Sequence, residues 1–401
     1  MNVDGDVEHE PHDRLRDRLK EAVADGDVGT TKSLLERIHL RSGWGGEIDA
    51  PTHFGILKDA FEAGVRAGQE ETSTACLRAM AQDAQLKEVA RRRLPDVLSI
   101  VATTAGTPVV GIPPEVLDRQ IRHVAQAALA GLVRPEDVTS LMRGNDRSPL
   151  LHAVLAAPAR FRAVVEAYAK AGRDQIVRGE PLKALMQARD DGETVLLAAA
   201  RQDVGEAVLT FMDAAHATRR RNALNDRAYL QLITEGSGDT TVMAALCAPP
   251  SLLHLDRPAN ALKAYLDGLL MARLPGAESL GDQVFEQVLL APGSDGKPAI
   301  GQCAPDQAAM IRSKLKDALD VGLLKSATVE NILRHLPASG QEADVPAPVP
   351  GEVDELSGDD AARAWELVRS ASGFEPAVPR RDPRPRGRTD DFATPQRFSK
   401  A

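Results

Sequence analysis

The sequence predicts an all-α protein: an N-terminal helical domain, then a helical-repeat solenoid, then a disordered C-terminal tail. Three observations lead to this prediction. Apolar residues recur at helical spacing along most of the chain. Only 3% of the 401 residues are aromatic although 43% are apolar, so Ala, Leu and Val must fill the cores, which suits closely packed helices. Finally, a polar turn followed by a short helix recurs between residues 141 and 280.

The N-terminal part is predicted to be a helical domain over residues 13–135, preceded by a polar, acidic and disordered stretch at residues 1–12. One of its helices carries Arg91–Arg93 and is expected to end near Pro95, because proline does not continue a helix. Cations are favourable at the negative end of a helix dipole. We therefore interpret Arg91–Arg93, and likewise Arg219–Arg221, as basic residues that close a helix.

The middle region, residues 136–336, is predicted to be the repeat array with capping helices. Each copy has a polar turn, then Pro or Thr at the start of a short helix, then Ala residues that allow close packing. Three copies align with spacings of 45 and 46 residues (146 to 191 to 237). The alignment predicts that the following residues are buried in equivalent positions: Leu151, Leu196 and Val242. A weaker fourth copy is predicted at residues 295–300.

The first two copies carry a family resemblance. Ser148-Pro-Leu-Leu-His-Ala-Val154 resembles the ankyrin Thr-Pro-Leu-His-x-Ala motif, with the histidine one place late. Asp191-Gly-Glu-Thr-Val-Leu-Leu-Ala-Ala199 resembles the Asp-Gly-x-Thr-x-Leu-x-x-Ala core of the same family. The chain therefore resembles a degenerate ankyrin-repeat protein, a class that includes bacterial effectors delivered into host cells. Because the period exceeds the ankyrin period of about 33 residues, a generic α-α solenoid is the alternative.

The resemblance implies a scaffold that binds another protein through the concave surface of the repeats. Candidate partner-binding residues lie in the repeat turns, namely Asp146, Arg147, Asp191, Glu193 and Asp239. No catalytic, cofactor-binding or metal-binding residue is predicted, and His152 is interpreted as a packed or capping histidine. The rival hypothesis is an enzyme whose site lies in residues 1–140 and whose repeats recruit the substrate. A cleft there with convergent ionisable groups of perturbed pKa would favour it.

Composition and pattern argue against several other classes. A net charge of −9 disfavours a nucleic-acid-binding protein. The sequence holds no apolar run of 18 residues, so no membrane span is predicted. The segment Ala291–Pro298 lacks the first glycine and the final Ser or Thr of a phosphate-binding loop, and no small-molecule cofactor is expected.

The expected location follows from cysteine usage and from the N-terminus. Cys76, Cys247 and Cys303 stand far apart in the sequence, and each is expected to be a small buried residue in a reducing compartment. The N-terminus does not resemble a secretory signal. We therefore predict a cytoplasmic protein or, for an effector, one secreted without a cleavable signal peptide that acts inside a host cell.

The last part of the chain is predicted to be mostly irregular. Residues 337–356 read as an acidic, proline-rich linker, and residues 357–374 as a short helix. Residues 375–401 are rich in proline and arginine and are predicted to be a disordered basic tail.

Overall fold

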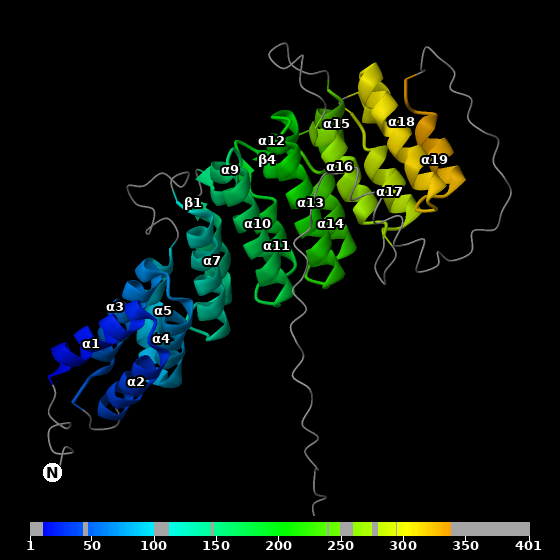
Figure 1. Ribbon diagram of the computed structural model, residues 1–401. Helices are drawn as coiled ribbons and strands as arrows, with labels where there is room; N and C mark the ends of the chain where they lie inside the picture. The colour runs from blue at the N-terminus through cyan, green and yellow to red at the C-terminus, as the bar shows by residue number, and fades with distance from the viewer. Residues whose placement is uncertain are drawn as a thin grey trace, which may run out of the picture.

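The computed structural model describes residues 11–42, 47–99, 112–145, 148–238, 240–248, 260–274, 280–293 and 295–337. These residues are predominantly helical and include almost no strand, which confirms the all-α prediction. The helices follow one another along an elongated, curved body, from α1 at the blue end to α19 at the orange end (Figure 1). The predictions for residues 1–10 and 338–401, which include the linker, the short helix and the tail, lie outside the described residues.

The first five helices form an N-terminal bundle. Their bounds are α1 His12–Asp25, α2 Val28–Ser42, α3 Ala50–Ala67, α4 Glu70–Gln82 and α5 Ala84–Leu98. Helix α3 packs against α1, α4 and α5 and buries Phe54 and Phe61. Helices α1 and α3 each end at a glycine, Gly26 and Gly68, with φ of 74° and 81°. Glycine reaches this left-handed conformation without a Cβ clash, which lets the chain turn into the next helix.

The structure corrects the interpretation of the basic run on α5. The helix does not stop near Pro95 but continues to Leu98, so Arg91–Arg93 lies within it. Leu94 and Leu98 are both buried, and their packing holds the last turn although Pro95 has no backbone N–H to donate. The interpretation of Arg219–Arg221 fits better, since α13 ends at Arg220.

The rest of the described chain repeats one order of elements. After α7 (Pro114–Leu129) and α8 (Pro135–Arg143) come two two-residue antiparallel hairpins, β1–β2 (Gly144–Asn145 with Ser148–Pro149) and β3–β4 (Arg189–Asp190 with Glu193–Thr194). Two single bridges, Ser237 with Thr240 and Pro292 with Pro298, stand where further hairpins would be. A short helix follows each of the four: α9 Leu150–Val154, α12 Val195–Arg201, α15 Val242–Cys247 and the 3-10 helix η2 Ala299–Gln302.

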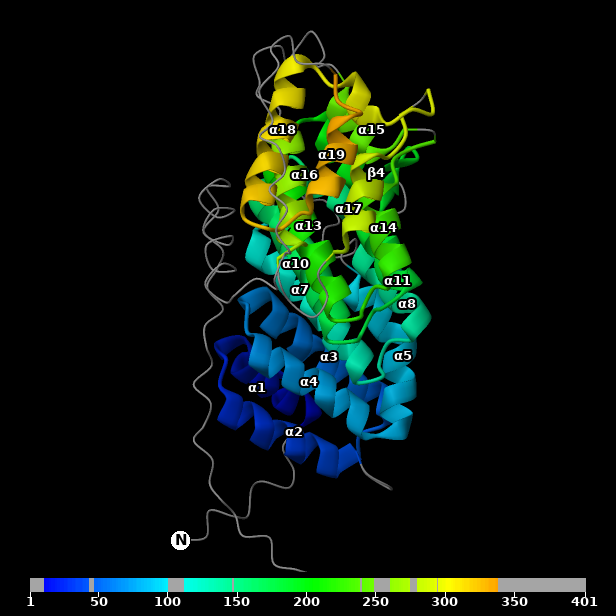
Figure 2. The same ribbon diagram turned by 90° about the vertical axis from the view of Figure 1, so that its right-hand side faces the viewer.

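Two more helices complete each segment. The long helices are α10 Pro158–Arg173, α13 Gly205–Arg220, α16 Asn260–Met271 and α18 Pro305–Asp320. The third helices are α11 Glu180–Met186, α14 Asp226–Thr234, α17 Asp282–Leu289 and α19 Ser326–Leu333. Short helices pack on short helices from α9 to η2, and long helices on long helices from α7 to α18 (Figures 1 and 2). Among the third helices, α8 contacts α11, α11 contacts α14, and α17 contacts α19.

The hairpin pairing corrects the alignment of the third copy by one residue. Because Ser237 pairs with Thr240 as Asp190 pairs with Glu193, Ser237 is the equivalent of Asp190 and not of Asp191. Val242 is buried as predicted, but it matches the first residue of α12 rather than Leu196. The true equivalents are each at most 1% exposed: Leu151, Leu196, Met243 and Ile300.

A second recurring feature, which the sequence analysis did not predict, ends the long helices. Residues with positive φ stop α7, α10, α13 and α18, namely Gly131, Gln175, Asn222 and Gly322, with φ of 67°, 59°, 55° and 73°. In each turn, the amide of the next residue donates to a carbonyl in the last turn of the helix. Apolar residues then follow and are mostly buried, as with Leu132 after Gly131.

Candidate functional site

The predicted partner-binding residues of the second hairpin lie at an exposed tip. Asp191 and Gly192 have φ of 49° and 78°, the two left-handed positions of a tight hairpin turn. Asp191 is exposed, whereas Glu193 is partly covered and forms an ion pair with Arg201, 2.8 Å between Oε1 and the guanidinium. Asp191 therefore offers its carboxylate to solvent, while Glu193 also holds the end of the following short helix.

The other three predicted site residues, Asp146, Arg147 and Asp239, lie outside the described residues. Of the five, the structure therefore brings together Asp191 and Glu193 alone, within a single hairpin.

Successive hairpins are tied by one recurring hydrogen bond. Each comes from a side chain at or near the start of a short helix and ends on a backbone carbonyl beside the next hairpin. Thr194 Oγ1 donates to Glu235 O at 3.2 Å, and Thr241 Oγ1 donates to Pro292 O at 3.0 Å. In the first segment His152 takes this role, with Nε2 2.9 Å from Ala188 O. Because a carbonyl only accepts, the proton lies on Nε2, and His152 is the structural histidine that the sequence analysis expected.

Sequence reasoning missed the residue that most directly joins two hairpins. The guanidinium of Arg189 donates to Gly192 O in its own hairpin at 2.9 Å and to Gly236 O beside the next one at 3.0 Å. It also pairs with the carboxylate of Glu235 at 3.2 Å. The planar, forked donor set of arginine suits such a bridge. The sequence did contain a signal for this role, since Arg189 stands directly before the Asp-Asp-Gly turn.

The short helices carry small side chains, several of which are partly exposed. Ala153, Ala244 and Ala245 are partly exposed, while Ala198 is 4% exposed. The exposed charges of Arg201 and Asp191 flank this surface. Such a shallow, small-residue surface with charged edges is suited to contact with another macromolecule. The arrangement supplies neither an activated nucleophile nor a paired acid and base.

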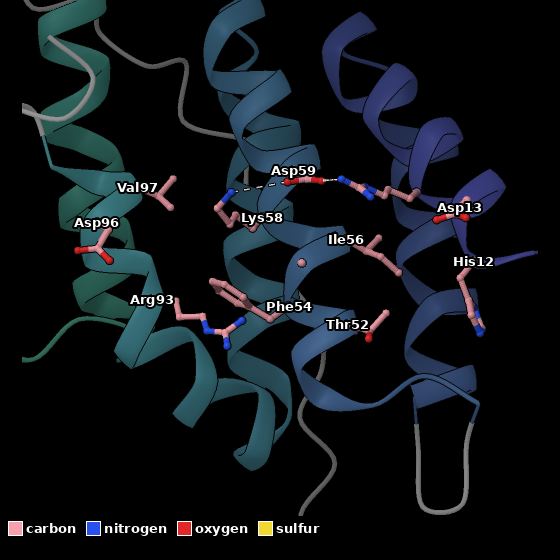
Figure 3. Close-up of a pocket in the computed structure, with 12 residues that line it drawn as sticks. His12, Asp13, Thr52, Phe54, Ile56, Lys58, Asp59, Arg93, Asp96 and Val97 are labelled. Carbon is pink, nitrogen blue, oxygen red and sulfur yellow. Dashed lines mark hydrogen bonds and ion pairs between the residues drawn. The ribbon is translucent and has the colours of Figure 1, made fainter. Parts of the chain in front are cut away.

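A cleft of about 560 Å³, lined by both apolar and charged residues, lies in the N-terminal bundle between α1, α3 and α5 (Figure 3). Its floor is the exposed side of α3, where Gly55 is so open that an added Cβ would meet no atom within 4 Å. Its edges carry charges of both signs from α1 and α5, namely Asp13, Arg16, Arg93 and Asp96. Arg93 thus belongs to this edge rather than to a helix end.

Charged partners neutralise the centre of the cleft. Asp59 forms ion pairs with Arg16 and, at 3.6 Å, with Lys58. Lys58 also contacts Glu62 at 2.8 Å, and this hydrogen bond, followed by the attraction of both carboxylates, raises the pKa of Lys58. Lys58 therefore stays protonated and does not serve as a general base. The cleft is suited to hold a polar ligand more than to move protons.

All three cysteines are buried and free, which confirms the expectation that each is a small buried residue. Cys247 and Cys303 are far apart in sequence, but the structure makes them neighbours, close enough for a thiol–thiol hydrogen bond. Each lies near the end of a short helix or just after it, in two successive segments. Aligning the segments could have revealed this pair. Thr241 and Pro298 stand directly before the short helices of the third and fourth segments, and Cys247 and Cys303 follow them by six and five positions.

Two further features are absent from the part of the chain that the structure describes. No group of three or more His, Cys, Asp or Glu side chains there could hold a metal ion. None of the helices in the described ranges is long and apolar enough to cross a membrane.

Comparison with known proteins gives no match: no family model, no curated protein and no solved structure is similar to the chain.

Proposed function

We propose that the chain is a helical-repeat protein that binds a protein partner through the face formed by its hairpins and short helices. The observation that carries the proposal is the fourfold recurrence of hairpin or bridge, short helix, long helix and third helix, with equivalent elements packed on one another. Repeats of this kind bury a continuous core between neighbours and leave an extended surface for recognition.

The proposed repeat is ankyrin-like with an added helix. An ankyrin unit has a turn and two helices in about 33 residues. Here the short helices begin after Pro149, Thr194, Thr241 and Pro298, which gives spacings of 45, 47 and 57 residues (149 to 194 to 241 to 298). The third helix, with 7 residues in α11 and 9 in α14, accounts for most of the excess in the first two spacings. The array further extends back to residue 114, because α7 and α8 match a long helix, its turn and a third helix.

The partner surface is supported by the rigidity of the hairpin row. The hydrogen bonds from His152, Thr194 and Thr241, together with Arg189, fix each hairpin relative to the next. A rigid row of exposed tips loses little conformational entropy on binding, which favours affinity for a large partner. The location in the cytoplasm, or delivery into a host cell as an effector, stays a prediction.

Site-specific photo-crosslinking tests the proposed face. A photoreactive residue is placed at Asp191, at an exposed hairpin tip, or at Arg227, exposed at the opposite end of the segment. Each protein is irradiated in extract of the cells that produce it. We expect one crosslinked protein from position 191, competed by excess unlabelled chain, and none from position 227. Arg201→Glu, on the same face, should abolish the product and lower the thermal midpoint only slightly, because the ion pair with Glu193 that it breaks is largely exposed. Identical products from both positions, or none from position 191, would contradict the proposal.

The rival enzyme hypothesis is supported by one observation, the cleft between α1, α3 and α5. Gly55→Leu would fill that cleft from its floor, because the Cβ direction is open. If the rival is correct, this variant should lose turnover while the crosslink from position 191 persists. If the partner-binding proposal is correct, binding of the partner is the only activity, and Gly55→Leu leaves the crosslink from position 191 unchanged.

A further inference from the structure

The contact between Cys247 and Cys303 joins two successive segments. Cys247 is the last residue of α15, and Cys303 follows η2 directly. The two elements pack on each other, and the thiols are 1% and 5% exposed as whole residues. The hydrogen bond with Cys303, and then burial, raises the pKa of the Cys247 thiol. That effect requires the two sulfur atoms to be close neighbours.

The backbone around the pair is held in place on both sides. Thr241 Oγ1 donates to Pro292 O at 3.0 Å near the start of α15. Near its end, Gln307 Nε2, buried and on α18, donates to Leu246 O at 3.0 Å. Cys303 lies between Pro292 and Gln307, and Cys247 directly follows Leu246. Both cysteines are therefore next to hydrogen bonds that already join their segments.

We propose that Cys247 and Cys303 form a redox-active pair that a low-molecular-weight disulfide, such as oxidised glutathione, converts into a bridge between α15 and η2. The thiolate of one cysteine attacks a sulfur atom of the small disulfide, forming a mixed disulfide and releasing one small thiolate. The thiolate of the other cysteine attacks the protein-bound sulfur, forming the S–S bond and releasing the second small thiolate. The two protein thiols lose two protons and two electrons, and the small disulfide is reduced to two thiols.

Burial and access decide which cysteine reacts first. Cys303 is the more exposed, and its neighbour Gln302 is exposed on the surface. The raised pKa of Cys247 disfavours its thiolate form. Cys303 therefore makes the first attack during local opening, and Cys247 resolves the mixed disulfide. Once formed, the same burial shields the bridge from reducing thiols, so the conversion is slow in both directions.

The bridge would close a loop that contains α16 and α17. The cysteines are 56 positions apart (303 − 247), and crosslinking so long a loop strongly restricts the unfolded chain. A native bridge of this kind reduces the unfolded fraction by roughly 30- to 1000-fold. Under oxidising conditions, the C-terminal half of the array becomes more resistant to unfolding and proteolysis.

The test uses the full chain incubated with a mixture of oxidised and reduced glutathione. The protein starts with three free cysteines, so formation of the bridge should leave one reactive thiol under denaturing conditions. The intact mass should fall by two hydrogen atoms with no glutathione attached, and digestion should give one peptide pair that joins Cys247 to Cys303. The thermal midpoint should rise and return to its starting value after reduction.

Three variants serve as controls. Cys76→Ala removes the single buried thiol of α4 and should leave bridge formation unchanged. Cys247→Ala should stop the reaction at a glutathione adduct on Cys303, and Cys303→Ala should slow all modification. The incubation is repeated in sub-denaturing urea, which populates the open form. A wild-type chain that gives only adducts, keeps three thiols even in urea, or pairs Cys76 would overturn the proposal.

Discussion

His123 on α7 is buried between the N-terminal bundle and the repeat segments, and it should make stability depend on pH. The residue is 1% exposed, and its ring packs edge-on against Phe61 of α3 at a centroid separation of 5.4 Å. Neither ring nitrogen has a hydrogen-bond partner among the described residues. Burial, and then the nearby charges of Arg119 and Arg122, lower the pKa of His123 from 6.5 to about 4.

The sign and size of the effect follow from this shift. Between the unfolded pKa and the folded one, the unfolded chain binds a proton that the folded chain does not. The contribution of neutral His123 to the free energy of unfolding is therefore complete above the pKa of the unfolded state. It is lost as the pH falls toward the pKa of the folded state. At about 1.4 kcal/mol per pKa unit, His123 alone should cost about 3 kcal/mol between neutral pH and about pH 4. His53 and His216, with similarly lowered pKa, add to the total loss in the wild type.

Comparison with His123→Leu isolates the contribution of this one histidine. At neutral pH the variant should be about 1 kcal/mol more stable, because it removes buried nitrogens without partners. The difference should widen to about 4 kcal/mol near pH 4, as measured by urea unfolding followed by circular dichroism. The free energy of unfolding of His335→Leu, a substitution at an exposed position, should change with pH as that of the wild type does. If wild type and His123→Leu lose stability in parallel from neutral pH to about pH 4, the lowered pKa is wrong.

Three further substitutions test the packing of the segments. Gly205→Ala should lower the free energy of unfolding by about 1–3 kcal/mol, because its Cβ would come 2.8 Å from the backbone oxygen of Asn260. Gly55→Ala is the control, and it should lower stability by nothing in the same thermal assay, because the space around its Cβ is open. Ala198→Leu should also cost about 1–3 kcal/mol, since Ala198 is 4% exposed on α12, and an unchanged thermal midpoint would contradict this. Arg189→Met should speed hydrogen exchange around the Ser237–Thr240 pairing. The global free energy of unfolding should fall by less than about 1 kcal/mol, because the Arg189 side chain is 41% exposed. Unchanged exchange would show that the contacts of Arg189 with the next hairpin are unimportant.

The parts of the fold that could be predicted from the sequence depend on local chemistry. Thr194 caps α12 through the amide of Leu197, and the Asp-Gly pair before it makes the hairpin, as the residue types require. The turns after the long helices were missed for an equally local reason. Two of the four use Gln175 and Asn222 in the left-handed conformation, where glycine would have been a visible signal. Asparagine adopts this conformation more readily than most residues, but glutamine does not, so the residue type at position 175 gave no signal.

The candidate sites show where sequence reasoning stops. Arg93 and Arg16 line the same cleft only because α5 and α1 both pack against α3, and no spacing along the chain encodes that arrangement. The Cys247–Cys303 contact is different, because both residues occupy nearly the same place in consecutive segments. An alignment that included the fourth segment in its true register would have placed these two cysteines together.

The one-residue error in the third copy has a specific physical cause. A tight two-residue hairpin turn has two positions of positive φ, and glycine is suited to either of them. In the second hairpin glycine takes the second of these positions, at Gly192, whereas in the third it takes the first, at Gly238. Aligning glycine with glycine therefore shifts the two copies by one residue. The two consecutive threonines conceal this shift in the sequence, since either Thr240 or Thr241 could cap a helix. In the structure Thr240 pairs with Ser237, and the hydroxyl of Thr241 accepts the hydrogen bond from the amide of Ala244. In the proposed repeat, the register is fixed by hairpin pairing and burial together, because a one-residue slip would move the buried positions of the short helix out of the core.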